Sequence, residues 1–208
     1  MNIYVILLKS DINRTKRVLS IKDNHLPKLK ILDAVDGKLI NQDFLNFLIS
    51  NNALTQNVLK NYTKGTIGCY LSHMKMWTTI RKYNLENTII LEDDFKLVNN
   101  FNENIHKVIK ELPETFDICY LFYHPFCYKY YKTFDKFDIE DKKYIRKQVP
   151  TWGLVGYMVS NKGANKLIEL CNTMEGHIDN HVSKLILLGK LEAYHSKDIL
   201  VDTVGACL

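Results

Sequence analysis

Short apolar runs alternate along this chain of 208 residues with segments in which apolar positions recur at helical spacing. The apolar runs are rich in β-branched residues and predict strands, whereas the helical spacing predicts helices between them. The predicted strands are 3–8, 31–35, 88–91, 118–123 and 154–159, with a late strand ending near 194. The predicted helices begin near 10–14 and then cover 41–54, 66–83, 103–112, 162–171 and 182–188.

This alternation of strand and helix predicts an α/β fold with a mainly parallel, twisted sheet flanked by helices. Neither linkers nor internal repeats interrupt the pattern, and the length suits one domain with its own core. We therefore predict that residues 1–208 form a single domain.

Three adjacent acids, Glu92-Asp93-Asp94, follow the apolar run 88–91. The run predicts a buried strand that ends at these carboxylates, and open α/β sheets bind ligands at the carboxyl ends of their strands. Like charges this close repel, so one interpretation places a cation between them. Mg²⁺ and Mn²⁺ take oxygen ligands and share them with substrate phosphates. The other interpretation is an acidic turn that keeps the strand end soluble.

The net charge of +5 suits anionic small molecules, but no basic stripe or nucleic-acid motif accompanies it, so no nucleic-acid partner is predicted. No apolar run approaches the roughly 18 residues of a membrane span, and the first residues lack the basic start and cleavage site of a signal peptide. The five cysteines are scattered without a paired CxxC spacing, which favours free thiols in a reducing compartment. We expect a cytoplasmic protein, in the host cytoplasm if the chain is viral.

Two blocks, residues 63–73 (Thr-Lys-Gly-Thr-Ile-Gly-Cys-Tyr-Leu-Ser-His) and 89–94 (Ile-Ile-Leu-Glu-Asp-Asp), resemble the signature of glycosyltransferase family 25. That family includes bacterial lipooligosaccharide galactosyltransferases and collagen hydroxylysine galactosyltransferases. Further stretches resemble its blocks in the same order: Ala34-Val35-Asp36-Gly37, Phe116-Asp117-Ile118, Trp152-Gly153 with residues 157–164, and His177-Ile178-Asp179. Thr66 and Asn13 stand where the family usually has Glu and Asp, so the sugar specificity is not carried over.

The resemblance implies a GT-A fold, with a Rossmann-like nucleotide-binding half of about 1–100 and an acceptor-side half of about 101–208. It implies transfer of a hexose, galactose or glucose, from a UDP-sugar to a hydroxyl group, with inversion and with Mn²⁺ (or Mg²⁺). The acceptor would be a glycan, a lipid-linked glycan or a protein. A catalytically inactive relative that binds nucleotide sugar or glycan is the alternative. An unrelated α/β phosphohydrolase or nuclease would show further acids at neighbouring strand ends, and none is visible.

The leaving group of such a reaction is a diphosphate, whose developing charge a metal ion neutralises as a Lewis acid. We expect Asp94 to bind the metal directly and Glu92 to share that task or to hold the ribose. Asp93 points to the opposite face of an extended backbone, where it anchors backbone groups around the donor site.

Inversion needs a base that takes the proton from the acceptor hydroxyl. Asp179 matches the family's late Asp and lies at a helix start, where a carboxylate is well placed, although a simple N-cap is the competing interpretation. His195 ends the late strand, where it either completes the metal shell as a neutral imidazole or is an exposed strand-end histidine.

Four further residues are assigned to the donor site. His73 lies one turn before Trp77, so it contacts the donor or braces the acidic loop. Arg14, in the first strand-to-helix loop, reaches the diphosphate with its guanidinium or stays solvated. Trp152 and Gly153 belong there by resemblance.

Two other features of the sequence carry predictions. The spacing of Cys69 beside Leu71 predicts a core position. The segment 120–146 is rich in Tyr, Phe and Lys, including Tyr128-Lys129-Tyr130-Tyr131-Lys132, and predicts an acceptor-binding lid or a two-stranded flap. Its aromatic density also permits self-association as a homodimer.

Overall fold

The computed structural model describes residues 1–149 and 151–204, and within these the side chains of all residues except 125 and 128–132. The strands are β1 (Asn2–Leu7), β2 (Lys30–Asp33), β3 (Thr88–Glu92), β4 (Phe95–Leu97), β5 (Ile118–Tyr120), β6 (Ile145–Lys147), β7 (Gly156–Val159), β8 (Ala193–Ser196) and β9 (Val201–Thr203). The helices are α1 (Ile12–Asn24), α2 (Gln42–Ser50), α3 (Gln56–Asn61), α4 (Lys64–Lys82), α5 (Phe101–Glu111), α6 (Asn161–Leu170) and α7 (Ile178–Leu187), with 3₁₀ turns η1 (Gly37–Leu39) and η2 (Pro125–Phe137). Within these described residues, no helix is both long and apolar enough to cross a bilayer.

In the described part of the chain, one seven-stranded sheet has the order β2-β1-β3-β7-β5-β8-β6, and β4 pairs separately with β9. Strands β1, β2, β3, β5 and β8 share one direction, whereas β6 and β7 run against it. The α/β fold with a mainly parallel sheet is therefore confirmed. The carboxyl ends of β1, β2, β3 and β5 meet the amino end of β7 at one edge, and this edge holds the acidic triplet.

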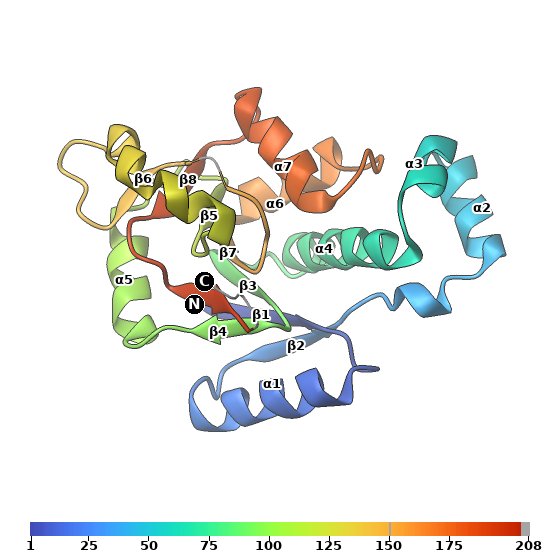
Figure 1. Ribbon diagram of the computed structural model, residues 1–208, viewed down its shortest axis with the longest axis horizontal. Coiled ribbons are helices and arrows are strands. Elements are labelled where there is room, and N and C mark those ends of the chain that lie inside the picture. The colour runs from blue at the N-terminus through green and yellow to red at the C-terminus, as the bar shows by residue number, and fades with distance from the viewer. Residues whose placement is uncertain (150, 205–208) are drawn as a thin grey trace.

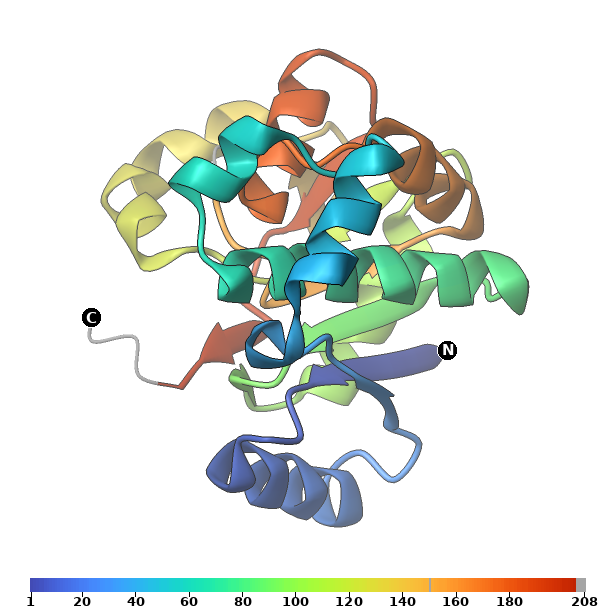
Figure 2. The ribbon, with the colours of Figure 1, turned by 90° about the vertical axis from the view of Figure 1, so that its right-hand side faces the viewer.

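Helices cover both faces of the sheet (Figure 1). Alternate residues of β3 serve the two layers: Ile89 and Leu91 belong to the cluster packed by α1 and α5, while Ile90 belongs to the cluster packed by α4, α6 and α7. Figure 2 shows α1 and α4 on opposite sides of the first strands. Strands that are buried on both faces read as continuous apolar runs, which is why the sequence pattern located them.

Two predictions about local structure are wrong. The last long helix begins at Ile178 with His177 as its N-cap, so Asp179 is inside the helix and does not cap it. The segment 120–146 contains η2 followed by the short strand β6, and it does not form a two-stranded flap. The side chains of residues 128–132, which prompted the lid hypothesis, lie outside the described residues, so that hypothesis stays a prediction.

The N-terminal half of α4 packs directly on the loop that follows β2. A Cβ on Gly68 would lie 2.5 Å from the carbonyl oxygen of Val35, and a Cβ on Gly37 would lie 2.4 Å from that of Lys64. The Ser72 hydroxyl joins the two segments, since it donates to the Gly68 carbonyl (2.6 Å) and accepts from the Val35 N–H (2.8 Å). Only glycine permits this approach, and it positions α4 beside the sheet edge.

Replacement of Gly68 by Ala is therefore expected to destabilise the protein by about 1–3 kcal/mol, the usual range for overpacking. The matched control is Gly65→Ala in the same helix, because the nearest atom to its added Cβ is 3.5 Å away. That control should be neutral or slightly stabilising, since alanine favours helix. Urea denaturation of both variants measures the difference, and equal midpoints would contradict the proposed close approach.

Candidate active site

The three acids at the end of β3 differ in exposure: the Asp93 side chain is buried, whereas Glu92 and Asp94 lie nearer the surface. Asp93 is 5% exposed; its Oδ2 accepts from the Leu8 N–H (2.8 Å) and its Oδ1 from Arg14 Nη1 (2.5 Å). Arg17 donates to the carbonyl oxygens of Asp93 and Phe95. Asp93 thus bonds a backbone N–H, in keeping with its predicted direction on the strand, while its assignment to the donor site stays a prediction. Helix α1 holds the turn in place through two arginines.

Asp94 has the environment that a cation ligand requires. Its Oδ1 is buried and has no hydrogen-bond partner among the described residues. Burial and then the neighbouring Glu92 carboxylate raise the pKa of Asp94. A buried acceptor without a donor is costly, and a bound cation would satisfy it and relieve the repulsion from Glu92. The residues present thus fit a hard divalent metal ion.

Glu92 is oriented by a chain of hydrogen bonds from the core. Trp77 Nε1 donates to the Tyr157 hydroxyl (2.9 Å), which also bonds His73 Nδ1 (2.9 Å). His73 Nε2 lies 3.0 Å from Glu92 Oε1. A carboxylate only accepts, so Nε2 carries the proton and donates it. His73 is thus the polar brace that one of its two interpretations predicted.

The surroundings of His73 also favour the charged form of its ring, in which both nitrogens carry a proton. Burial of the ring opposes its charged form, but Tyr157, Cys69 and Glu92 together raise the pKa of His73 above its ordinary value. We call the hydrogen-bonded chain Trp77–Tyr157–His73–Glu92 the core relay. It holds the Glu92 carboxylate in one orientation at the sheet edge.

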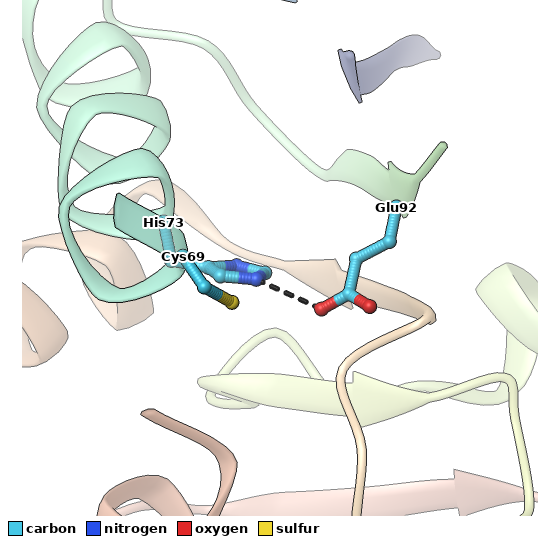
Figure 3. Close-up of side chains that lie close together, drawn as sticks. All are labelled: Cys69, His73 and Glu92. Atoms are coloured by element: carbon cyan, nitrogen blue, oxygen red, sulfur yellow. Dashed lines mark hydrogen bonds and ion pairs between the residues drawn. The ribbon is translucent and has the colours of Figure 1, made fainter. Parts of the chain in front are cut away.

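Cys69 lies on the same face of α4 as His73 (Figure 3). Against prediction, it is exposed. One turn of helix separates it from His73, so both side chains point at Glu92, and the ligand atoms of the three residues lie within 4.8 Å of one another. A cation held by all three would have to break the hydrogen bond between His73 and Glu92. The pair of Glu92 and Asp94 is the better cation site, because Asp94 Oδ1 has no such bond to lose.

A cavity of about 560 Å³ opens beside the triplet, within the 300–1,000 Å³ range of small-molecule sites. Its wall includes Arg14, Lys38 and Lys64, with Glu92 and Asp93 at one end. The N-terminus of α4, from its N-cap Thr63 to Gly65, forms another part of the wall. A larger cavity of about 750 Å³ adjoins α5 and α6 and contains none of the predicted site residues.

Asp179, Trp152 and Gly153 are brought together at the same sheet edge. Asp179 Oδ2 accepts from the Gly153 N–H (3.1 Å) and Oδ1 from the Asn180 N–H (2.9 Å). Gly153 has φ +84°, a left-handed conformation that favours glycine. The loop then continues to Val155, whose carbonyl accepts from the Glu92 N–H (2.9 Å). Trp152 and Gly153, expected at the donor, therefore lie beside Asp179.

His195 is not brought to the triplet. It is fully buried, with its ring stacked on Tyr123 at a centroid distance of 3.9 Å, so the exposed strand-end interpretation is wrong. Burial lowers its pKa to about 3, which keeps the ring neutral. In the sheet order β8 is three strands from β3, which at about 4.8 Å per strand is roughly 14 Å.

The family is now decided by comparison. A profile described as "Glycosyltransferase family 25 (LPS biosynthesis protein)" matches residues 1–182. The chain belongs to glycosyltransferase family 25. Its relatives in family 25 include human procollagen galactosyltransferase 2, which is 29% identical over 175 residues, or 80% of this chain and 27% of that protein.

Family 25 also contains relatives described as inactive. The rat probable inactive glycosyltransferase 25 family member 3 is 27% identical over 119 residues, or 53% of this chain and 20% of that protein. The chain thus spans about a quarter of the length of these relatives. Among solved structures, apo mouse xyloside xylosyltransferase 1 aligns with a TM-score of 0.45 and 10% identity, covering 99% of this chain and 84% of that one.

Two members of the core relay escaped the sequence reasoning about this family 25 chain. Tyr157 and Trp77 are apolar-looking positions in a strand and a helix, and periodicity predicts only that they are buried. The available signal was that a buried hydroxyl or indole N–H needs a partner. That rule predicts a hydrogen bond but does not identify the residue that makes it.

Replacement of Tyr157 by Phe is expected to cost about 1–3 kcal/mol, because the Trp77 N–H and His73 Nδ1 lose a buried partner. The matched control is Tyr83→Phe, at a tyrosine that is 61% exposed, and it should change stability by less than about 0.5 kcal/mol. Chemical denaturation measures both variants. A Tyr157→Phe protein as stable as the control would show that the core relay does not hold this site together.

Proposed function

We propose that this family 25 chain is a metal-dependent, inverting glycosyltransferase. It moves a hexose, galactose or glucose, from a UDP-sugar to a hydroxyl group of a glycan, lipid-linked glycan or protein acceptor. The observation that carries the proposal is the unpartnered, buried Oδ1 of Asp94 beside Glu92, at the strand edge next to the 560 Å³ cavity. Membership of the family supports the glycosyltransferase class.

The cavity suits the donor's diphosphate. Lys38 and Lys64 supply positive charge, and the N-terminus of the 19-residue helix α4 adds N–H groups and the positive end of its dipole. Arg14 lies in the wall but already pairs with Asp93, so it contributes to charge balance through that pair. All lining residues fall between 6 and 93, which supports a nucleotide-binding half of about 1–100.

Asp94 and Glu92 would hold Mn²⁺ (or Mg²⁺), which when bound neutralises charge on the departing diphosphate. The core relay keeps Glu92 turned toward this position. Asp93 and the two arginines of α1 keep the turn from moving. His195, buried three strands away, is left out of this proposed metal site.

Asp179 is proposed as the base that takes the acceptor proton. The N–H groups of Gly153 and Asn180 orient its carboxylate at the start of α7. A hydrogen bond supports this proposal: Asp179 accepts from Gly153, which lies two residues before Val155, and the Val155 carbonyl accepts from the Glu92 N–H. The base and the metal ligands thus adjoin the same loop, which a single displacement requires.

An inactive relative that only binds nucleotide sugar or glycan is the second candidate. Inactive members among the relatives favour it, as does Thr66, which stands where family 25 members usually have Glu. The two candidates share the donor cavity and differ in turnover, so catalytic release of UDP separates them.

UDP release from a panel of UDP-sugars is expected to depend on Mn²⁺ and to be selective for one sugar. Asp94→Asn should lower it by about a hundredfold or more, because loss of a metal ligand removes several kcal/mol of stabilisation. The matched control is Asp23→Asn, an exposed carboxylate in α1, which should release UDP at the wild-type rate.

Each outcome separates the candidates. Binding of UDP without release from any sugar, with acceptor glycans present, would favour the inactive relative. Absence of UDP binding would contradict the donor site itself. Equal release by Asp94→Asn and the wild type would contradict the assigned metal ligand.

Asp94→Asn is also expected to stabilise the metal-free protein at neutral pH. The fold raises the pKa of Asp94. Its protonated carboxyl therefore adds to the free energy of unfolding below the pKa of the unfolded chain, about 3.9, and this contribution is lost as the pH rises through the higher pKa of the folded protein. An asparagine cannot ionise and avoids that loss. The stability difference between Asp94→Asn and the wild type should therefore grow from pH 4 to pH 7 in chelator.

At saturating Mn²⁺, the wild type should become more stable than Asp94→Asn. At one hundred times its Kd, the ion would stabilise the wild type by about 2.7 kcal/mol and the variant by much less. Thermal or urea unfolding with and without Mn²⁺ measures both effects, with Asp23→Asn as control. Equal gains in all three proteins would place the ion elsewhere.

A further inference from the structure

A group of aromatic side chains lies beside Asp179 and has no role in the donor site. Phe126 is 67% exposed and Trp152 is 48% exposed. The ring of His124 lies between them, stacked on Phe126 (centroids 5.2 Å apart) and edge-on to Trp152 (5.9 Å). We call these three side chains the aromatic platform.

Hydrogen bonds on both flanks hold the aromatic platform in place. The His124 N–H donates to Thr151 Oγ1 (3.3 Å), and His124 Nδ1 accepts from the Phe126 N–H (3.3 Å). On the other flank, Gly153 donates to Asp179, and a Cβ at Gly153 would lie 3.0 Å from the Phe122 ring. Exposed rings that are held this way bind a ligand without first having to be ordered.

The aromatic platform adjoins one polar group, the carboxylate of Asp179. Asp179 accepts two backbone N–H groups and, as a carboxylate, has further lone pairs to accept hydroxyl protons. A sugar ring matches this combination, because its C–H face packs on aromatic rings while its hydroxyls donate to a carboxylate. A lipid chain would gain nothing from the carboxylate and would desolvate it.

We propose that the aromatic platform is the acceptor subsite and that the acceptor group it binds is a hexose ring of a glycan. The inference rests on the proposed function, because it gives Asp179 the acceptor as its partner and moves Trp152 from the donor to the acceptor side. The hydroxyl that reacts is the one presented to Asp179, while Phe126 and Trp152 bear the ring and exclude water from it. The acceptor is thus a saccharide rather than a free amino-acid side chain.

Tryptophan fluorescence reports on this subsite selectively. The chain has two tryptophans, and Trp77 is fully buried and bonded to Tyr157, so a sugar changes the emission through Trp152. Methyl glycosides of galactose, glucose and N-acetylglucosamine, with their disaccharides, are titrated into the full chain with UDP and Mn²⁺ present. We expect a saturable change in emission for at least one sugar, and saturation-transfer NMR signals on its ring C–H protons.

Variants decide whether the aromatic platform carries the binding. Trp152→Ala and Phe126→Ala should each weaken the sugar's Kd by about tenfold, as aromatic anchors commonly do. Saturation-transfer NMR measures Trp152→Ala, because that variant lacks the side chain whose emission changes. Asp179→Asn should also weaken binding of the sugar, and it should change which hydroxyl groups of the sugar contribute to the affinity. Phe47→Ala is the matched control, since Phe47 is also exposed (58%) and stacked on Phe44, but in α2. Thermal unfolding of each variant verifies its fold.

The outcomes also separate this inference from the proposed function. Wild-type protein that binds UDP but no sugar overturns the acceptor subsite alone, as do Trp152→Ala and Phe126→Ala proteins that bind the sugar like wild type. Binding of a hydroxylysine-containing peptide in place of every sugar also overturns it, in favour of a protein acceptor. Absence of UDP binding refutes the proposed function, while sugar binding lost in Trp152→Ala would still support a glycan site.

Discussion

Repulsion between adjacent carboxylates at the end of β3 is the constraint on which the site depends. Asp93 is neutralised by Arg14 and bonded to the backbone of Leu8, so it becomes a structural anchor. Glu92 is turned the other way by His73. Asp94 alone keeps a buried oxygen without a partner. The fold thus gives three chemically similar neighbours three different surroundings, and the pair of Glu92 and Asp94 forms the cation site that we propose.

Helix α4 connects this edge to the core. Gly68 allows it to touch the loop after β2, its N-terminus lines the proposed donor cavity, and its middle turns carry His73 and Trp77. The wall of the cavity and the brace of Glu92 therefore belong to one rigid element. A change in the packing of α4 on the sheet would alter both together, which couples the stability of this layer to the geometry of the site.

The antiparallel strand β7, between β3 and β5, separates two groups of residues at this edge of the sheet. On one side, β1, β3, the loop after β2 and helix α4 line the cavity. On the other side, the loop before β7 supplies Trp152 and meets α7 at Asp179. Because the Glu92 N–H bonds Val155 at the start of β7, the two sides are joined by backbone. This arrangement brings residues from distant parts of the chain to the two sides of the proposed reaction, as a displacement at a sugar carbon would need.

The sequence by itself determined the α/β class, the core strands, most helix bounds and the family, because buried strands and amphipathic helices leave local periodic patterns. It also indicated the triplet and the position of Asp93. The tertiary structure alone decided that Cys69 is exposed, that His195 is buried three strands away and that Trp152 lies beside Asp179. Those facts depend on which strands are neighbours and on contacts between residues far apart in sequence, and local periodicity contains no information about either.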